Sequence, residues 1–148
     1  MRTPSATVLV VEDDPGDQEL LRRAFAQSDS RLALRFTNDG DEALGYLRQT
    51  RGDCADEFPR PRFILLDLNM PRLDGLGFLR AVATDSDFAA IPALIFTTST
   101  NEGEIREAYR LGCKSYIPKP VDLSGLVAVA RLVTEYWCRL SLTPNSVH

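Results

Sequence analysis

Short apolar runs alternate with segments of helical periodicity along the whole chain, and this alternation restricts the fold more than any other feature of the sequence. Strands are predicted at 8–11, 32–36, 63–67, 93–97 and 115–117, and helices at 17–25, 39–47, 75–83, 102–111 and about 122–140. The central apolar runs show no alternation of period two, as expected for parallel strands covered on both faces. With right-handed crossovers, the pattern predicts an α/β fold: a doubly wound, five-stranded parallel sheet with helices on both faces.

Length and composition fit a single globular domain. The chain has 148 residues, of which 44% are hydrophobic, with a net charge of −4 and a pI near 5.0. This charge provides no basic surface for nucleic acid or for an anionic membrane. The three cysteines lack the spacing of zinc ligands, and no signal peptide or membrane span is visible. We therefore expect one cytoplasmic domain over 1–148, with a core at about 6–140 and a short tail at 141–148.

Reactive side chains stand at the ends of four predicted strands. They are Glu12, Asp13 and Asp14 after the first strand, Asp67 after the third, Thr97, Thr98 and Ser99 at the fourth, and Lys119 after the fifth. In a doubly wound sheet these strand ends lie at one edge. Clustered carboxylates repel one another unless a cation neutralises them, and oxygen ligands without His or Cys favour Mg²⁺. A carboxylate nucleophile, a metal ion, a lysine and a hydroxyl together predict a phosphoryl-transfer site.

Four segments resemble the receiver domain of two-component response regulators. They are Val10–Pro15 (VVEDDP), Leu65–Pro71 (LLDLNMP) with Asp74 and Gly75, Phe96–Ser99 (FTTS) and Tyr116–Pro120 (YIPKP). The resemblance extends from Val8 to about Cys138 and implies the CheY-like strand order 2-1-3-4-5. It implies that Asp67 accepts a phosphoryl group from a sensor histidine kinase. The protein would then be a signalling protein and not an enzyme, apart from reacting with small phosphodonors and dephosphorylating itself.

The resemblance also assigns roles to the residues around Asp67. Asp13, Asp67 and the backbone carbonyl of Asn69 would bind Mg²⁺ directly, and Glu12 would bind it through a water molecule. Lys119 would contact the transferred phosphoryl group. The peptide bond between Lys119 and Pro120 is expected to be cis, because that geometry would direct the lysine toward the site.

The same resemblance implies a conformational switch. Thr97 would move toward the phosphoryl group, and Tyr116 would rotate into the space that Thr97 leaves. This movement would change the surface formed by the fourth predicted helix, the fifth strand and the last helix. Asn69 and Ser99 would flank the path of the water that hydrolyses the acyl phosphate, and so would tune its lifetime.

The last predicted helix carries more apolar surface than a helix needs to cover a sheet. Such a surplus suggests a partner, and symmetric homodimers are the commonest closed oligomers. We therefore expect a homodimer through this helix. The candidate interface residues are Leu123, Val127, Tyr136 and Trp137. The alternative is a wide core-facing stripe that Tyr136 or Trp137 covers as a lid.

Several features are similar to the stand-alone response regulators that partner bacterial and cyanobacterial phytochrome kinases. These features are the long loop 49–62, the Ile91-Pro92 pair, the Thr97-Thr98-Ser99 run and the aromatic end of the last helix. The resemblance implies that the partner kinase is a bacteriophytochrome. None of these features has a mechanism of its own that is tied to light.

Three other classes of protein offer a carboxylate-lined α/β site or the same fold. A phosphatase of the haloacid dehalogenase type needs an Asp-x-Asp motif after the first strand, where this chain has Glu12-Asp13-Asp14. An FMN-binding protein needs amides and hydroxyls at that place, not acids. A receiver fold could also serve only for dimerisation or docking, without phosphorylation. The complete set of acids, hydroxyl and lysine argues against that third class.

Overall fold

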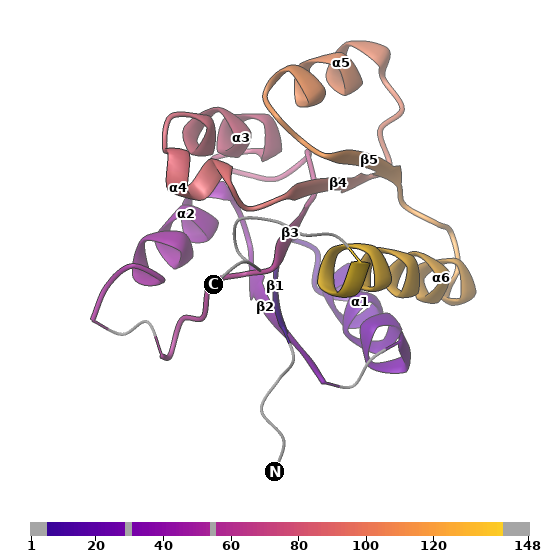
Figure 1. The fold of residues 1–148 in the computed structure, drawn as a ribbon. Coiled ribbons are helices and arrows are strands. Elements are labelled where there is room, and N and C mark those ends of the chain that lie inside the picture. The colour runs from indigo at the N-terminus through magenta and orange to yellow at the C-terminus, as the bar shows by residue number, and fades with distance from the viewer. Residues whose placement is uncertain (1–5, 29–30, 54–55, 141–148) are drawn as a thin grey trace.

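The computed structural model describes residues 6–28, 31–53 and 56–140. Five parallel strands form one sheet in the order β2-β1-β3-β4-β5, which confirms the predicted fold and strand order (Figure 1). The strands are β1 (Ala6–Val11), β2 (Leu32–Thr37), β3 (Phe63–Leu66), β4 (Ala93–Thr97) and β5 (Ser115–Pro118). The helices are α1 (Pro15–Ser28), α2 (Gly40–Gln49), α3 (Gly75–Ala83), α4 (Ser86–Ala89), α5 (Glu102–Arg110) and α6 (Leu123–Thr134). The expected tail at 141–148 lies outside the described residues.

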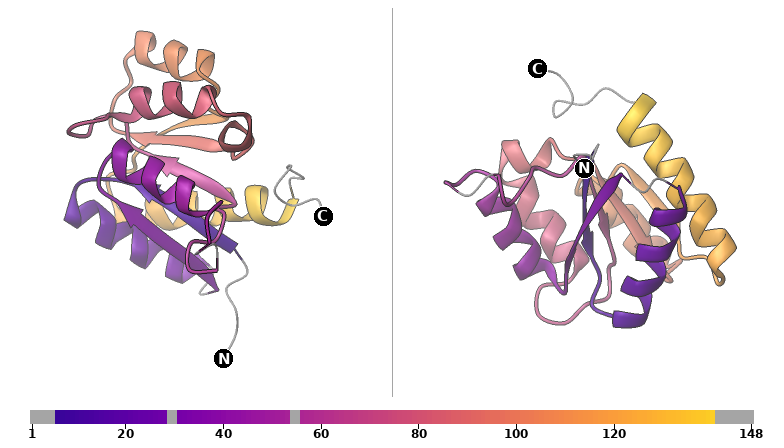
Figure 2. Two further views of the ribbon diagram at one scale, coloured as in Figure 1. Left: turned by 90° about the vertical axis from the view of Figure 1, so that its left-hand side faces the viewer. Right: turned by 90° about the horizontal axis from the view of Figure 1, so that it is seen from below.

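Helices cover both faces of the sheet (Figure 2). Helices α1 and α6 pack together on one face, while α2, α3 and α5 lie on the other. Alternate residues of the central strands enter two separate cores. Val8 and Val10 of β1 face α1 and α6, whereas Leu9 and Val11 face α2 and α3. Burial on both faces explains why the run at 63–66 is continuously apolar.

Helix α4 was not predicted from the sequence. It begins after Asp85, whose carboxylate accepts hydrogen bonds from the amides of Asp87 (3.0 Å) and Phe88 (3.2 Å). The helix has one turn and buries a single apolar side chain, that of Phe88. A periodic pattern requires a longer segment, and so a helix of this length leaves no periodicity to detect.

The end of the last helix also differs from the prediction. The α-helical geometry of α6 ends at Thr134, and residues Glu135–Leu140 continue as a π-helix, η1. Arg62 donates a hydrogen bond of 3.1 Å from Nη1 to the carbonyl of Cys138 in η1. A π-helix has a wider turn than an α-helix, and so a period of 3.6 residues does not predict which side chains of η1 face the core. Within the described parts of the chain, no helix has the length and apolarity to cross a membrane.

Candidate functional site

Three carboxylates meet where β1 and β3 end. The two strands are paired, with Val11 opposite Leu66, and so the residues that follow them are neighbours. Glu12, Asp13 and Asp67 each offer one oxygen, and these three oxygens lie within 4.8 Å of one another. Glu12 and Asp67 are buried, whereas Asp13 is exposed. The structure therefore brings together the three side chains that the sequence indicated as metal ligands.

Backbone hydrogen bonds hold two of these acids in place. The amide of Asp67 donates to the carbonyl of Val11 at 3.0 Å, and the amide of Glu12 donates to the carbonyl of Thr37 at 3.0 Å. Asn69 lies in the loop after β3 and is exposed, and its backbone amide donates to Oδ1 of Asp67 at 3.4 Å. The acids are thus attached to the ends of β1, β2 and β3, and the Asn69 backbone lies beside them.

The acid cluster fits a hard divalent cation. All three side chains offer oxygen, and no His or Cys contributes to the cluster. An open hollow of about 360 Å³ lies beside it, lined by Asp13, Leu68, Asn69, Met70, Pro71 and Asp74. Mg²⁺ prefers oxygen ligands and usually keeps several waters, for which an open polar hollow provides room. The residues present are therefore suitable for Mg²⁺ or a related ion such as Mn²⁺.

Lys119 reaches these acids from the segment after β5. Its Nζ donates to Oε1 of Glu12 (2.6 Å), Oδ2 of Asp17 (3.0 Å) and Oδ2 of Asp67 (3.2 Å). Burial lowers the pKa of Lys119, but the hydrogen bonds to Glu12 and Asp17 raise it by more, and the lysine stays charged at neutral pH. Burial raises the pKa of Glu12, and Lys119 offsets only part of that rise. The lysine is therefore a fixed positive charge next to Asp67.

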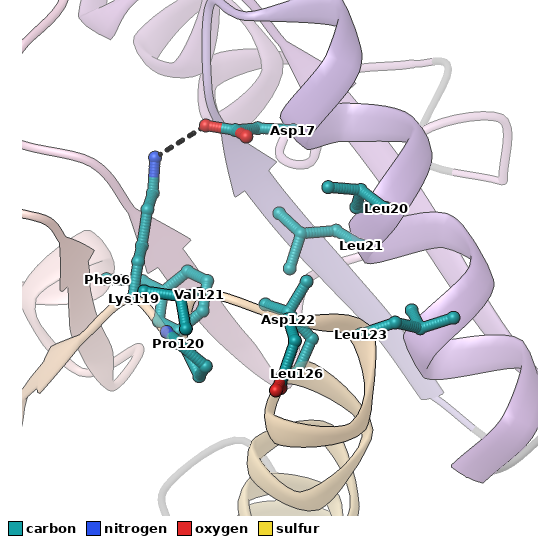
Figure 3. A pocket seen from close by; sticks show the side chains of 10 residues that line it. All are labelled: Asp17, Leu20, Leu21, Phe96, Lys119, Pro120, Val121, Asp122, Leu123 and Leu126. Carbon is teal, nitrogen blue, oxygen red and sulfur yellow. Dashed lines mark hydrogen bonds and ion pairs between the residues drawn. The ribbon is translucent and has the colours of Figure 1, made fainter.

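Sequence reasoning missed Asp17, which lies in the first turn of α1 and forms the third ion pair of Lys119 (Figure 3). Behind this ion pair is a pocket of about 240 Å³ between α1 and the start of α6, with Phe96 and Leu126 among its apolar side chains. The Pro15-Gly16 pair marks the start of the helix and could have placed an acid in its first turn, close to the strand end. The direction of the side chain depends on how α1 packs.

Thr97, Ser99 and Tyr116 form a second group of residues at the ends of β4 and β5. Thr97 is fully buried, and its hydroxyl accepts a hydrogen bond of 3.4 Å from the amide of Ser99. The Tyr116 hydroxyl donates to the carbonyl of Ser99 at 2.9 Å. The Ser99 hydroxyl donates to Oε1 of Glu104 in α5 at 2.6 Å. The two predicted switch residues, Thr97 and Tyr116, thus bind the same residue, which is itself bound to α5.

The prediction of a cis peptide bond before Pro120 was wrong. Every peptide bond in the described ranges, including Lys119–Pro120, is trans. The trans isomer is the more stable one for most bonds that precede proline. With this bond trans, Lys119 still donates to Asp67, and its amide donates to the carbonyl of Thr97 at 2.8 Å.

Most of the predicted interface residues of the last helix contact the core of the same chain. Three of the four are partly buried against the core between α1 and α6: Leu123, Val127 and Trp137. Tyr136 is 52% exposed and packs edge to face on Trp137. The other large exposed apolar side chains at this end are Leu132 (68%) and Leu140 (71%). We call Leu132, Tyr136 and Leu140 the C-terminal apolar surface.

The sequence matches the family "response regulator receiver domain" over residues 8–131. Response regulator Rcp1 of Synechocystis is 31% identical over 141 residues, which are 95% of each chain. A crystal structure of the Mn²⁺-bound form of Rcp1 has a TM-score of 0.80 and covers 94% of this chain and 99% of that one.

Two further proteins illustrate the range of relatives. The crystal structure of the phosphorylated cyanobacterial phytochrome response regulator RcpA has a TM-score of 0.84 at 35% identity, covering 94% of this chain and 98% of that one. The probable methanogenesis regulatory protein FilR2 of Methanothrix harundinacea is 33% identical over 138 residues, which are 93% of this chain and 87% of FilR2. Regulators with different named contexts therefore share about a third of this sequence.

Proposed function

This chain belongs to the response regulator receiver domain family, and from that premise we propose that it is a phosphorylation switch in which Asp67 accepts a phosphoryl group from a sensor histidine kinase. The observation that carries the proposal is the contact of Lys119 with Asp67 and Glu12, beside Asp13. An acid that acts as a nucleophile toward phosphorus needs positive charge close to it, because charge stabilisation and positioning provide most of the catalysis of phosphoryl transfer.

The proposed reaction is an in-line displacement at phosphorus. A carboxylate oxygen of Asp67 forms a bond to phosphorus while the bond from phosphorus to the kinase histidine nitrogen breaks, and that nitrogen keeps the electron pair. The product is an acyl phosphate on Asp67. Hydrolysis later replaces the Asp67 oxygen on phosphorus by a water oxygen, with loss of a proton to solvent, and releases inorganic phosphate. Apart from this self-dephosphorylation, we propose no enzymatic turnover.

We propose Mg²⁺ as the resident metal ion, held by Asp13, Asp67 and the Asn69 carbonyl, with Glu12 acting through a water molecule. The oxygen-only cluster and its open hollow support this choice. When bound, the ion would offset negative charge on the phosphoryl oxygens. Lys119 would hold a phosphoryl oxygen from the other side with a charge-assisted hydrogen bond. Asn69 and Ser99 would flank the path of the hydrolytic water and so would tune the lifetime of the acyl phosphate.

The proposed switch begins at Thr97. Its hydroxyl accepts a long hydrogen bond from the Ser99 amide and would donate its own proton to a phosphoryl oxygen. Movement of Thr97 would shift Ser99, and Ser99 carries the hydrogen bonds to Tyr116 and Glu104. The surface of α5, β5 and α6 would then change, because one residue connects the strand end to both α5 and β5.

We propose a phytochrome-type sensor kinase as the partner, because RcpA is a phytochrome response regulator of comparable length and fold. We also propose a homodimer that uses the C-terminal apolar surface, with Trp137, which packs on Tyr136, at its edge. As inferred from the sequence, the protein would act as one cytoplasmic domain and bind neither nucleic acid nor membranes. The family match gives no support to the phosphatase alternative.

The test is phosphorylation of the purified protein by acetyl phosphate with Mg²⁺, detected by intact-mass spectrometry. A second assay measures transfer of the phosphoryl group from a candidate kinase. We expect one phosphoryl adduct on the wild-type protein and none on Asp67→Asn, because the amide cannot act as the nucleophile. Rapid multiple turnover of small phosphate esters would instead support a phosphatase. Absence of any adduct on the wild-type protein, with acetyl phosphate and with kinases, would defeat the proposal.

A further inference from the structure

Loop 68–74, which follows Asp67, is bound at its tip to the start of α2 by an ion pair between Arg72 and Asp39. We propose that this pair is a clamp that positions the loop for metal binding, so that Arg72 and Asp39 are positioning residues of the site. The inference rests on the proposed function, because it assigns to the clamp an effect on the proposed metal site. Neither residue is a member of the acid cluster.

The ion pair is built around a buried carboxylate. The side chain of Asp39 is 4% exposed, and its Oδ2 accepts a hydrogen bond of 2.6 Å from Nε of Arg72. Nη2 of Arg72 contacts the same oxygen at 2.5 Å and lies 3.8 Å from Oε2 of Glu42. The other oxygen, Oδ1, accepts from the Glu42 amide at 2.9 Å and caps α2. A buried charge of this kind needs its partner, and so the attachment of the loop is strongly favoured.

The backbone of Arg72 indicates that the loop is held in place. Arg72 has a φ of 60°, and it is the only non-glycine residue with positive φ in the part of the chain that the structure describes. This conformation is unfavourable for a residue with a Cβ and persists where the surroundings impose it. The next residue adds a second attachment, since the amide of Gly40 donates to the carbonyl of Leu73 at 2.8 Å. A Cβ at Gly40 would lie 2.7 Å from that oxygen, and only glycine permits the approach.

The clamped loop contains the part of the backbone that faces the acids. Asn69 donates from its backbone amide to Asp67 and lines the open hollow together with Asp13. At the end of the loop, the amide of Gly75 donates to the carbonyl of Leu68 at 3.1 Å. Both ends of the loop are therefore attached close to Asp67, and the clamp fixes the tip between them.

The other side of the clamp is also connected to the acids. Asp39 follows β2, and the Thr37 carbonyl at the end of β2 accepts from the Glu12 amide. Gln18 donates from Nε2 to the Glu12 carbonyl at 2.6 Å and to Oδ1 of Asn38 at 3.0 Å. The ion pair thus joins the loop that carries Asn69 to the segment that supports Glu12. Loss of the clamp would let the two sides of the metal site separate.

The experiment measures Mn²⁺ affinity of the full chain by electron paramagnetic resonance of free Mn²⁺. Three variants break the clamp in different ways. Arg72→Ala removes the guanidinium, Arg72→Gly removes it while favouring the left-handed backbone, and Asp39→Asn keeps Oδ1 for the α2 cap but presents an amide group to Arg72. The matched control is Arg51→Ala, which breaks an ion pair with another helix-capping acid, Asp85 (3.0 Å), away from the site.

We expect the three clamp variants to raise the Kd for Mn²⁺ about threefold or more. This is less than the roughly tenfold or larger loss on removing a direct hydrogen-bond partner of a metal ligand, because the clamp contacts no ligand side chain. Arg51→Ala should leave the Kd unchanged. The double variant Arg72→Ala/Asp39→Asn should bind Mn²⁺ no more weakly than the worse single variant, because both changes break one interaction. Thermal unfolding in EDTA separates this effect from stability, since variants that melt earlier with an unchanged Kd would show a purely structural role and overturn the inference.

Two outcomes separate this inference from the proposed function. If the wild-type protein fails to bind Mn²⁺ and forms no adduct with acetyl phosphate, the metal site and the clamp are both wrong. If the wild-type protein binds Mn²⁺ while the clamp variants bind it with wild-type affinity, the clamp alone is wrong.

Discussion

The ammonium nitrogen of Lys119 lies 3.0 Å from Oδ2 of Asp17, which makes Asp17 a third carboxylate partner of this lysine besides Glu12 and Asp67. Each of the three N–H groups of the lysine therefore has its own acceptor. The partners differ in exposure: the side chain of Asp17 is 40% exposed, against 3% for Glu12 and 10% for Asp67. Water can replace Lys119 at Asp17 more easily than at the two buried acids.

This difference predicts unequal effects on phosphorylation. Lys119→Ala should slow phosphorylation of Asp67 by acetyl phosphate about 100-fold, because it removes the fixed donor to the phosphoryl group. Asp17→Ala should slow it less than about threefold, because an exposed ion pair contributes little and Lys119 keeps Glu12 and Asp67. Initial rates of adduct formation by intact mass would measure both. An Asp17→Ala variant as slow as Lys119→Ala would show that Asp17 is needed to hold the lysine.

The sequence was sufficient to predict the parallel sheet and the grouping of the three acids. Apolar runs such as 63–66 mark the buried strands, and in a doubly wound fold the residue after each strand is placed at one edge whatever the details of packing. Glu12, Asp13 and Asp67 could therefore be grouped before their positions were known. The π-helical end of the last helix and the single turn of α4 depend on tertiary contacts. Neither has a hydrophobic periodicity that can be recognised in the sequence.

Asp17 and the clamp were beyond sequence reasoning for a different reason. Which residue of the first turn of α1 faces Lys119 depends on the rotation of the helix against the sheet. The pairing of Arg72 with Asp39 joins two loops that are 33 residues apart, and it depends on the left-handed backbone of Arg72. Local patterns predict elements and their ends, but they do not predict contacts between loops.

Metal binding should stabilise the fold, and Asp13 should control the effect. At about 100 times its Kd, Mg²⁺ should raise the free energy of unfolding by about 2.7 kcal/mol. Asp13→Asn should remove most of this gain, yet in EDTA it should be as stable as the wild type or more stable by about 0.5 kcal/mol, because it relieves repulsion within the acid cluster. Urea unfolding in Mg²⁺ and in EDTA would measure these values.

The control for this experiment is Asp53→Asn, which removes an exposed acid outside the cluster. It should respond to Mg²⁺ as the wild type does. An equal gain from Mg²⁺ in Asp13→Asn and in the wild type would place the bound metal at another site.

The pH dependence of stability should report Asp39. Burial raises the pKa of this carboxyl, but hydrogen bonds from the Glu42 amide and from Arg72 lower it by more, and the net pKa lies below its ordinary value of 3.8. A lowered pKa in the folded state means that the ionised form stabilises the fold. This contribution is complete above about pH 5, where the carboxyl is ionised in the unfolded state too, and it is lost as the pH falls through the lower folded pKa.

Asp39→Asn should therefore be less stable than the wild type at pH 6, and the difference in the free energy of unfolding should shrink as the pH falls below about 5. Urea unfolding at several pH values would measure it. A difference that stays constant down to pH 3 would mean that the charge of Asp39 does not stabilise the fold.

The C-terminal apolar surface should determine the oligomeric state. Leu132 and Leu140 are 68% and 71% exposed, and a symmetric dimer would bury both side chains in each of its two copies. Removing one large apolar side chain from such an interface costs about 2 kcal/mol per copy, and so Leu132→Glu should raise the Kd of the dimer more than 100-fold. Val121→Glu is the matched control, because Val121 is exposed and lies before α6. Sedimentation equilibrium over a concentration series, with and without the phosphoryl mimic beryllofluoride, would measure both variants, and a wild-type protein that stays monomeric throughout would remove the dimer.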